Sequence, residues 1–249
     1  KACSHRKRRG GNSTVKSLRQ YLPWILYFVF FLGILAVNPG AHYTHLLARV
    51  IIFGLYAVAF NLLFGRTGLV SFGHALFYGI GAYITGMLAK ASGPDLFLLY
   101  ILLGGIGAAI VSVFIGLLSL RLTGMFFTML TLAFAQLAWG ITFKLYNFTG
   151  GDDGIQAIPK PAYLAGPVWK YYLFSFFVVT ICVFVIWRIS RSSFGMVLKG
   201  IRQNPGRITF MGLNVYKNQL VAYIISAFFT AIAGGLYAGL DGSIHPDML

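Results

Sequence analysis

The amino-acid sequence predicts an all-α membrane protein that crosses the bilayer several times. Hydrophobic residues make up 58% of the 249 residues and charged residues only 10%, and the mean hydropathy is +0.77. Soluble domains carry about a quarter charged residues, so this composition is typical of a protein that resides in lipid. Apolar stretches that approach the roughly 20 residues of a spanning helix recur along the chain. We therefore expect a bundle of about seven transmembrane helices.

Seven apolar stretches mark the expected helices. In chain order they cover 22–37, 46–64, 69–88, 96–118, 124–143, 171–187 and 219–240. The short connection between the second and third stretches predicts a tight hairpin, or a broken or re-entrant helix, near 65–73. Small residues at helical spacing follow one side of several stretches, which would let neighbouring helices approach closely in lipid.

The charged residues predict which ends of the helices face the cytoplasm. With the N-terminus inside, the cytoplasmic segments are 1–21, 65–68, 119–123 and 188–218, and they hold fifteen of the twenty Lys and Arg residues. They hold no acidic residue, because all five Asp residues fall on the other side. Lys and Arg in short loops favour the cytoplasmic side. We therefore interpret the net charge of +15 as a topology signal and an attraction to anionic lipids, not as a nucleic-acid-binding surface.

The third stretch carries a polar face and is our candidate wall of a solute pathway. Its polar residues recur every three to four positions, so they share one side of a helix. A deep histidine there is expected to be neutral, because a charge without a carboxylate nearby is costly in a membrane. The alternative is a structural helix whose polar groups only bond to its neighbours. With two polar residues of the fifth stretch, the pathway candidates are Ser71, His74, Tyr78, Thr85, Thr131 and Gln136.

The loop 146–170 is expected on the outer side of the membrane. It contains a glycine-rich acidic turn, and the prolines of IPKP at 158–161 stiffen the chain that follows. Such a turn either faces a partner protein or is an ordinary exposed loop. The residues of the turn are Gly150, Gly151, Asp152, Asp153 and Gly154.

The long segment 188–218 contains the signals of a short capped helix. Asn204 is a favourable N-cap, Pro205 suits the first helical position, and Gly212 suits the position just past the end. These residues predict a helix over Pro205–Met211, with Ile208 and Met211 on one side. Two helical turns are marginally stable alone, so the helix needs a surface to dock on, either a partner protein or the lipid head groups.

Three segments of the chain resemble the permease subunits of branched-chain amino-acid ABC importers of the LivM/LivH type. NLLFGRTGLVSFGHALFYGIGAY is similar to the family's hairpin region. LRLTGMFFTMLTLAFAQL and then TGGDDGIQAIPKP are similar to the next signature and its outer loop. RSSFGMVLKGIRQNPGRITFMGLNVYKNQLVAYIISAFFTAIAGGLYA resembles the coupling loop and the helix after it. The resemblance runs from about Val50 to Tyr237.

The resemblance implies a pore-forming subunit in the bacterial inner membrane. A second permease subunit, two cytoplasmic ATPases that hold ATP and Mg, and a periplasmic solute-binding protein would complete the importer, and this chain would hold no cofactor. We expect a basic cytoplasmic segment 1–21 and a permease domain 22–249 that is truncated at its C-terminus, since family members continue with further spans. Family members often carry acids in the coupling loop, whereas this chain has none there. The implied coupling residues are Arg202, Asn204, Pro205, Arg207, Ile208, Met211 and Gly212.

Other functions are weighed against this one. An importer for urea or short amides remains open, because similar permeases handle such solutes. A carrier driven by protons or sodium is disfavoured, because no carboxylate lies within a predicted span. A purely structural or assembly subunit would not need the polar faces. Catalysis is not expected, because the sequence shows no nucleophile–base set, metal cluster or nucleotide-binding motif.

Overall fold

The structure is a computed structural model of the chain. It forms two units, Lys1–Thr44 and His45–Leu249, and the packing described below is that within the second unit. The basic segment 1–21 and the first apolar stretch 22–37 lie outside the described residues. The description covers residues 40–248 with the exception of 94, 123, 162–163 and 165.

The described chain is helical, as predicted. Five helices, α2, α4, α5, α7 and α10, are long and apolar enough to cross a membrane. Helix α3 is not among them, because its histidine, tyrosines, lysine and glycines lower its hydropathy. The bounds are α2 Ala41–Thr67, α3 His74–Ser92, α4 Phe97–Ser119, α5 Met125–Lys144, α6 Tyr146–Thr149, α7 Val168–Arg191, α8 Ser193–Gln203, α9 Pro205–Phe210 and α10 Val215–Asp241, with 3-10 turns η1 Gly151–Asp153 and η2 Pro246–Met248.

The chain is unwound between α2 and α3, where the sequence predicted a break. Gly68 takes a left-handed conformation with φ of 78° directly after the end of α2. The Thr67 hydroxyl donates to the Leu63 carbonyl at 2.6 Å and accepts from the Leu69 amide at 3.3 Å. These bonds replace those that a continuing helix would make. Helix α3 therefore begins at His74, five residues later than the apolar stretch suggests.

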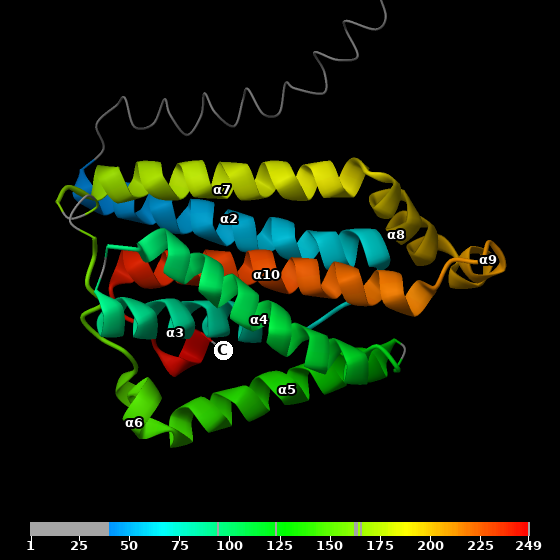
Figure 1. The fold of residues 1–249 in the computed structure, drawn as a ribbon, viewed down its shortest axis with the longest axis horizontal. Coiled ribbons are helices and arrows are strands. Elements are labelled where there is room, and N and C mark those ends of the chain that lie inside the picture. Colours follow the sequence, from blue (N-terminus) through cyan, green and yellow to red (C-terminus); the bar gives the residue numbers. More distant parts are fainter. Residues whose placement is uncertain (1–39, 94, 123, 162–163, 165, 249) are drawn as a thin grey trace, which may run out of the picture. The chain divides into compact units, whose positions relative to one another are not determined.

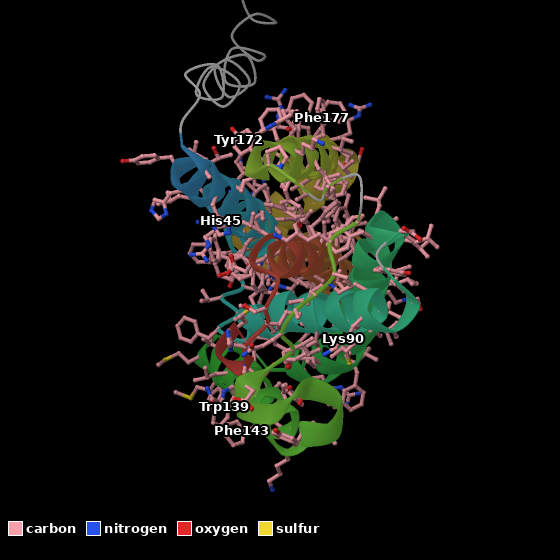
Figure 2. The ribbon with its side chains drawn as sticks, turned by 90° about the vertical axis from the view of Figure 1, so that its left-hand side faces the viewer. His45, Lys90, Trp139, Phe143, Tyr172 and Phe177 are labelled. Atoms are coloured by element: carbon pink, nitrogen blue, oxygen red, sulfur yellow. The ribbon has the colours of Figure 1, made fainter. Side chains whose placement is uncertain are left out.

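Helix α10 lies at the centre of the second unit, with α2, α3, α4 and α7 around it (Figures 1 and 2). Side-chain hydrogen bonds join α10 to three of these helices. On α10, the Ser226 hydroxyl donates to the Ala59 carbonyl of α2, and the Tyr216 hydroxyl donates to the Leu117 carbonyl of α4. The Tyr171 hydroxyl of α7 donates to the Leu236 carbonyl of α10. Glycine lets α3 pack closely against α10, because any residue with a Cβ at position 234 would overlap the Tyr78 carbonyl. Close backbone contact of this kind is how helices associate in lipid.

Helix α5 is covered by the rest of the chain on one narrow side only. Its buried residues are Phe127, Thr131 and Ala135. Trp139 and Phe143 stack on each other at 5.5 Å and project away from the other helices (Figure 2). In a membrane, this wide apolar surface of α5 faces lipid or another protein.

The described segments that the charge pattern assigns to one side of the membrane lie at one end of the helices (Figure 1), and they are 65–68, 119–122 and 188–218. At that end Arg202 Nη1 of α8 donates to the Gly65 carbonyl at the end of α2, at 2.6 Å. At the opposite end Ile155 pairs with Ile244, and Lys160 Nζ donates to the Leu240 carbonyl at 2.9 Å. Burial lowers the pKa of Lys160, and the charge of Asp241 opposes this shift.

The segment 188–218 contains one more helix than the sequence signals indicated. Helix α8 is amphipathic, and it packs through Leu198 and Ile201 onto Ala222 of α10. Its apolar side follows the helical period, so this signal was available in the sequence and was missed. Ile208 of α9 completes the same cluster.

Candidate functional site

The unwound segment 68–73 places the start of α3 deep between the other helices. The Thr128 hydroxyl of α5 donates to the Val70 carbonyl at 3.1 Å. A Cβ on Gly73 would overlap the Thr131 carbonyl, so only glycine lets the segment lie this close to α5. The first polar residues of α3 are therefore held between α2, α5 and α10.

His74 is enclosed and hydrogen-bonded. It is 1% exposed, and its Nε2 lies 2.9 Å from Ser226 Oγ. Ser226 donates its only hydrogen to the Ala59 carbonyl at 2.6 Å, so its oxygen must accept from Nε2–H. This assigns the neutral tautomer that carries its hydrogen on Nε2. The other ring nitrogen, Nδ1, has no hydrogen-bond partner in the described part of the chain. Aromatic rings surround it, namely Tyr56, Phe60, Phe77 and Tyr223.

A cavity of about 360 Å³ lies next to this cluster. Tyr78 is 5% exposed, and its hydroxyl has no hydrogen-bond partner among the described residues. Its ring lies 5.8 Å from that of Tyr56, 5.9 Å from that of Tyr237 and 6.0 Å from that of Phe53. The walls are thus largely aromatic, and they consist of Phe53, Tyr56, Ala75, Tyr78, Tyr237 and Met248.

A charged pair lies beside the aromatic wall. Arg49 Nη2 bonds to both carboxylate oxygens of Asp241 at 2.8 and 2.9 Å, and Arg49 Nε bonds to one of them at 3.2 Å. His45 Nε2 lies 3.4 Å from the same carboxylate. The guanidinium of Arg49 sits 5.8 Å from the centre of the Tyr237 ring, within range of a cation–π contact.

Sequence reasoning missed this pair, although a signal was present. Arg49 is the one charged residue in the apolar stretch 46–64. An ionisable residue within a span usually has a partner and a function. Asp241 was assigned only to an outer loop, whereas the structure makes it the last residue of α10.

The structure brings only some of the pathway candidates together. His74 and Tyr78 lie one turn apart on α3, but only Tyr78 belongs to the cavity wall. Thr85 donates to the Tyr100 carbonyl between α3 and α4, at 3.3 Å. Ser71 is buried and lies beside Tyr223. Their role in a pathway stays a prediction.

The two candidates on α5 have different surroundings. Thr131 is buried and donates to the Thr128 carbonyl at 2.8 Å. Gln136 is exposed on the wide apolar surface of that helix. Its part in a pathway also stays a prediction.

The glycine-rich turn 150–154 has a positive φ at each of its three glycines. Gly150, Gly151 and Gly154 have φ of 78°, 57° and 65°, a region that side chains disfavour. Asp153 is exposed between them. A second cavity of about 440 Å³ lies against this turn, lined by Met87, Lys90, Ala91, Tyr146, Gly150, Gly154 and Ile155.

Helix α9 forms where its capping residues predicted it. Asn204 Oδ1 accepts from the Arg207 amide at 3.1 Å. Gly212, with φ of 81°, donates to the Thr209 carbonyl, and Leu213 donates to the Ile208 carbonyl, which is the Schellman arrangement.

The two apolar residues expected on one side of α9 have different surroundings. Ile208 is buried against α8, whereas Met211 is exposed. Phe210, which the sequence analysis did not single out, is 94% exposed. The exposed large apolar side chains of α9 are therefore Phe210 and Met211.

Comparison with known proteins agrees with this architecture. A family model described as the branched-chain amino acid transport system / permease component matches residues 43–248. The chain is 28% identical over 222 residues to the high-affinity branched-chain amino acid transport system permease protein LivM of Escherichia coli K12. The aligned region covers 79% of this chain and 52% of that protein. It is 25% identical over 223 residues to a probable LivM of Methanocaldococcus jannaschii, covering 75% of this chain and 65% of that protein.

A further relative carries a different name. Over 119 residues the chain is 26% identical to the guanosine ABC transporter permease protein NupQ of Bacillus subtilis, covering 43% of this chain and 37% of that protein. The chain spans about half the length of the Escherichia coli relative, and no solved structure matches it. Because the family model covers most of the described helices, this chain belongs to the family of branched-chain amino-acid transport system permease components.

Proposed function

We propose that this chain is a pathway-forming subunit of an ATP-driven importer that brings branched-chain or related neutral amino acids across the bacterial inner membrane. Membership in the permease family and the LivM relatives support the class of solute. The proposed partners are a second permease subunit, two cytoplasmic ATPases that bind ATP and Mg, and a periplasmic solute-binding protein. The chain itself transports and does not hydrolyse ATP.

The main support for coupling to ATPases is the exposed apolar tip of α9. Phe210 is 94% exposed on a helix fixed at both ends by capping bonds. It lies in a segment with six basic residues and no acid, which favours the cytoplasmic side. A rigid helix that presents an exposed aromatic side chain suits a groove on a partner protein.

A nucleoside is the second candidate solute. Aromatic cavity walls can stack a base as well as enclose an aliphatic side chain, and one relative is named for guanosine. The charged pair beside the cavity favours the amino acid instead, because a nucleoside carries no carboxylate for Arg49 to bind.

The test is uptake by the complete importer in proteoliposomes, with ATP supplied on the ATPase side. We expect ATP-dependent uptake of labelled leucine, isoleucine or valine in preference to guanosine and urea. Uptake of guanosine or urea alone would reject the amino-acid assignment. Uptake of leucine that needs no ATP but follows a proton or sodium gradient would reject the importer class.

The coupling role of α9 is tested by replacing Gly212. A Gly212→Val variant places a β-branched residue at positive φ, which costs roughly 1 kcal/mol or more at the cap. We expect membrane insertion to persist while leucine-stimulated ATP hydrolysis and uptake fall. Gly212→Asn is the matched control, because asparagine tolerates this conformation. Wild-type hydrolysis in the valine variant would remove α9 from the coupling.

A further inference from the structure

The cavity between α2, α3 and α10 combines an aromatic wall with unused polar groups. Its volume of about 360 Å³ falls within the roughly 300–1,000 Å³ of small-molecule sites in proteins. Four of its six lining residues are aromatic, and the polar groups that could orient a solute are few. Mostly apolar walls with a small number of polar groups are typical of sites that select a solute.

The first unused group is the hydroxyl of Tyr78. It is enclosed by protein and has no hydrogen-bond partner among the described residues. Leaving a buried hydroxyl unpaired costs about 1–3 kcal/mol, so such groups are rare unless a ligand or water completes them. Because Tyr78 belongs to the cavity wall, a molecule in the cavity is the natural partner of this hydroxyl.

The second unused group is one end of the Arg49 guanidinium. Nε and Nη2 hold Asp241, which leaves the two hydrogens of Nη1 without a protein acceptor in the described part of the chain. The Arg49 side chain is 44% exposed, so Nη1 can be reached from outside. Tyr237 connects the two groups, because its ring lies beside both the Arg49 guanidinium and the Tyr78 ring.

We propose that this cavity, named here the aromatic cavity, binds the zwitterion of an apolar amino acid. The α-carboxylate accepts from Arg49 Nη1, and the aliphatic side chain packs between the rings of Phe53 and Tyr56. The ammonium donates to the Tyr78 hydroxyl oxygen and is attracted by the carboxylate of Asp241. A singly charged amine or acid leaves one of these groups without a partner. The inference rests on the proposed function, and it locates in this chain a site where the solute is held during passage.

The position of the site in the fold is consistent with an entry point. Asp241 ends α10, and η2 closes the cavity with Met248, so the charged pair lies at the end assigned to the outer side. Tyr78 lies in the second turn of α3, which begins deep between the helices. The aromatic cavity therefore extends inward from the outer end.

The experiment uses photo-leucine, the diazirine analogue of leucine, in the complete reconstituted importer. We expect illumination to label the segments that contain Phe53, Tyr56 or Tyr237, as read by mass spectrometry. L-Leucine should compete for this labelling, whereas isoamylamine and 4-methylvalerate, which each lack one of the two charges, should compete at least about tenfold more weakly. Equal competition by either analogue would overturn the zwitterion assignment.

Three variants separate recognition from folding. Tyr78→Phe removes only the unpaired hydroxyl, and we expect the half-competing concentration of leucine to rise about tenfold. The double variant Arg49→Gln with Asp241→Asn removes both charges together, so that neither is left alone, and should abolish the preference for leucine over isoamylamine. Tyr100→Phe, a buried tyrosine of α4 outside the cavity, is the control and should behave as wild type. Co-purification with the partner subunits reports correct folding.

The outcomes distinguish this site from the proposed function. Leucine uptake by the wild-type importer without labelling of the aromatic cavity, or with labelling that leucine does not displace, would overturn the site alone. Labelling by a diazirine fatty acid that leucine cannot displace would assign the cavity to a lipid chain and equally overturn it. Absence of branched-chain amino-acid uptake by the wild-type importer would reject the proposed function itself.

Discussion

At the residue scale, the hydrogen bonds around Ser226 join three helices. Its hydroxyl donates to the Ala59 carbonyl of α2 and accepts from His74 of α3 while sitting on α10. All of these groups are buried, so none can exchange its partner for water. In a low-dielectric interior an unpaired polar group is costly, which makes this short chain of bonds a determinant of how the three helices meet.

A Ser226→Ala variant should destabilise the protein. The Nε2–H of His74 loses its acceptor, and the expected loss is about 1–3 kcal/mol. Thermal unfolding of the purified complex in detergent, followed by the loss of its monodisperse elution peak, measures the change. Ser193→Ala, an exposed position at the start of α8, should remain within about 0.5 kcal/mol of wild type. Equal unfolding temperatures for the two variants would show that the bond contributes nothing.

A conservative substitution of His74 distinguishes a packing role of this residue from a role in transport. His74 does not belong to the wall of the aromatic cavity, and a glutamine amide can replace its donor. We therefore expect an assembled His74→Gln importer to keep the wild-type apparent affinity for leucine, isoleucine and valine. A changed selectivity among these solutes would instead place His74 on the pathway.

At the scale of elements, glycines set how closely α3 approaches α10. A Cβ on Gly81 would overlap the Ala231 carbonyl, and one on Gly234 would overlap the Tyr78 carbonyl. These contacts are between backbones, so no side-chain rotation could relieve them. In lipid, where apolar side chains gain little from hiding from one another, such close approach is a main source of helix association.

A Gly234→Ala variant should force α3 and α10 apart. Overpacking of this kind typically costs about 1–3 kcal/mol, and the aromatic cavity beside Tyr78 should be distorted as well. Gly54→Ala on α2 is the matched control, because nothing lies within 4 Å of the added methyl group, and alanine should favour the helix by roughly 1 kcal/mol. Detergent unfolding temperatures should therefore move in opposite directions for the two variants. A Gly234→Ala protein as stable as wild type would contradict the packing of α3 on α10.

At the scale of the whole second unit, the charge pattern and the hydrogen bonds between segments indicate the same two ends of the helices. The basic segments 65–68 and 188–218 meet where Arg202 bonds to the Gly65 carbonyl, and the outer loop meets the end of α10 where Lys160 bonds to the Leu240 carbonyl. Charge patterning concerns insertion into the membrane, whereas these contacts concern packing, so the two observations are independent. Their agreement supports the proposed sidedness.

Thiol accessibility measures the sidedness directly. In a chain with Cys3→Ser and Cys182→Ala, we introduce Asp153→Cys in the outer turn or Lys199→Cys on α8, both at exposed positions. An impermeant maleimide should label the first in right-side-out vesicles and the second in inverted vesicles washed free of peripheral subunits. The reverse pattern would invert the topology, and with it the proposed coupling role of α9.

The elements could largely be predicted from the sequence because their signals are local. Hydropathy located the described spans to within a few residues at most ends, and Asn204 and Gly212 predicted the caps of α9. Helix α8 was missed although its amphipathic period was readable. The candidate site was only partly predicted: Tyr78 was singled out for its polar face, while Arg49 and Asp241 were not paired.

Composition and neighbours within a few residues are therefore sufficient to predict the class of the protein, the positions of its helices and the expected sides of its loops. Which side chains meet depends instead on how the helices pack. Arg49 and Asp241 are 192 positions apart, and His74 and Ser226 are 152 apart. A membrane-spanning helix is apolar on nearly all sides, so hydropathy does not reveal which side faces a neighbouring helix. That choice is made by close backbone contacts and the few polar partners available, and these exist only once the helices are assembled.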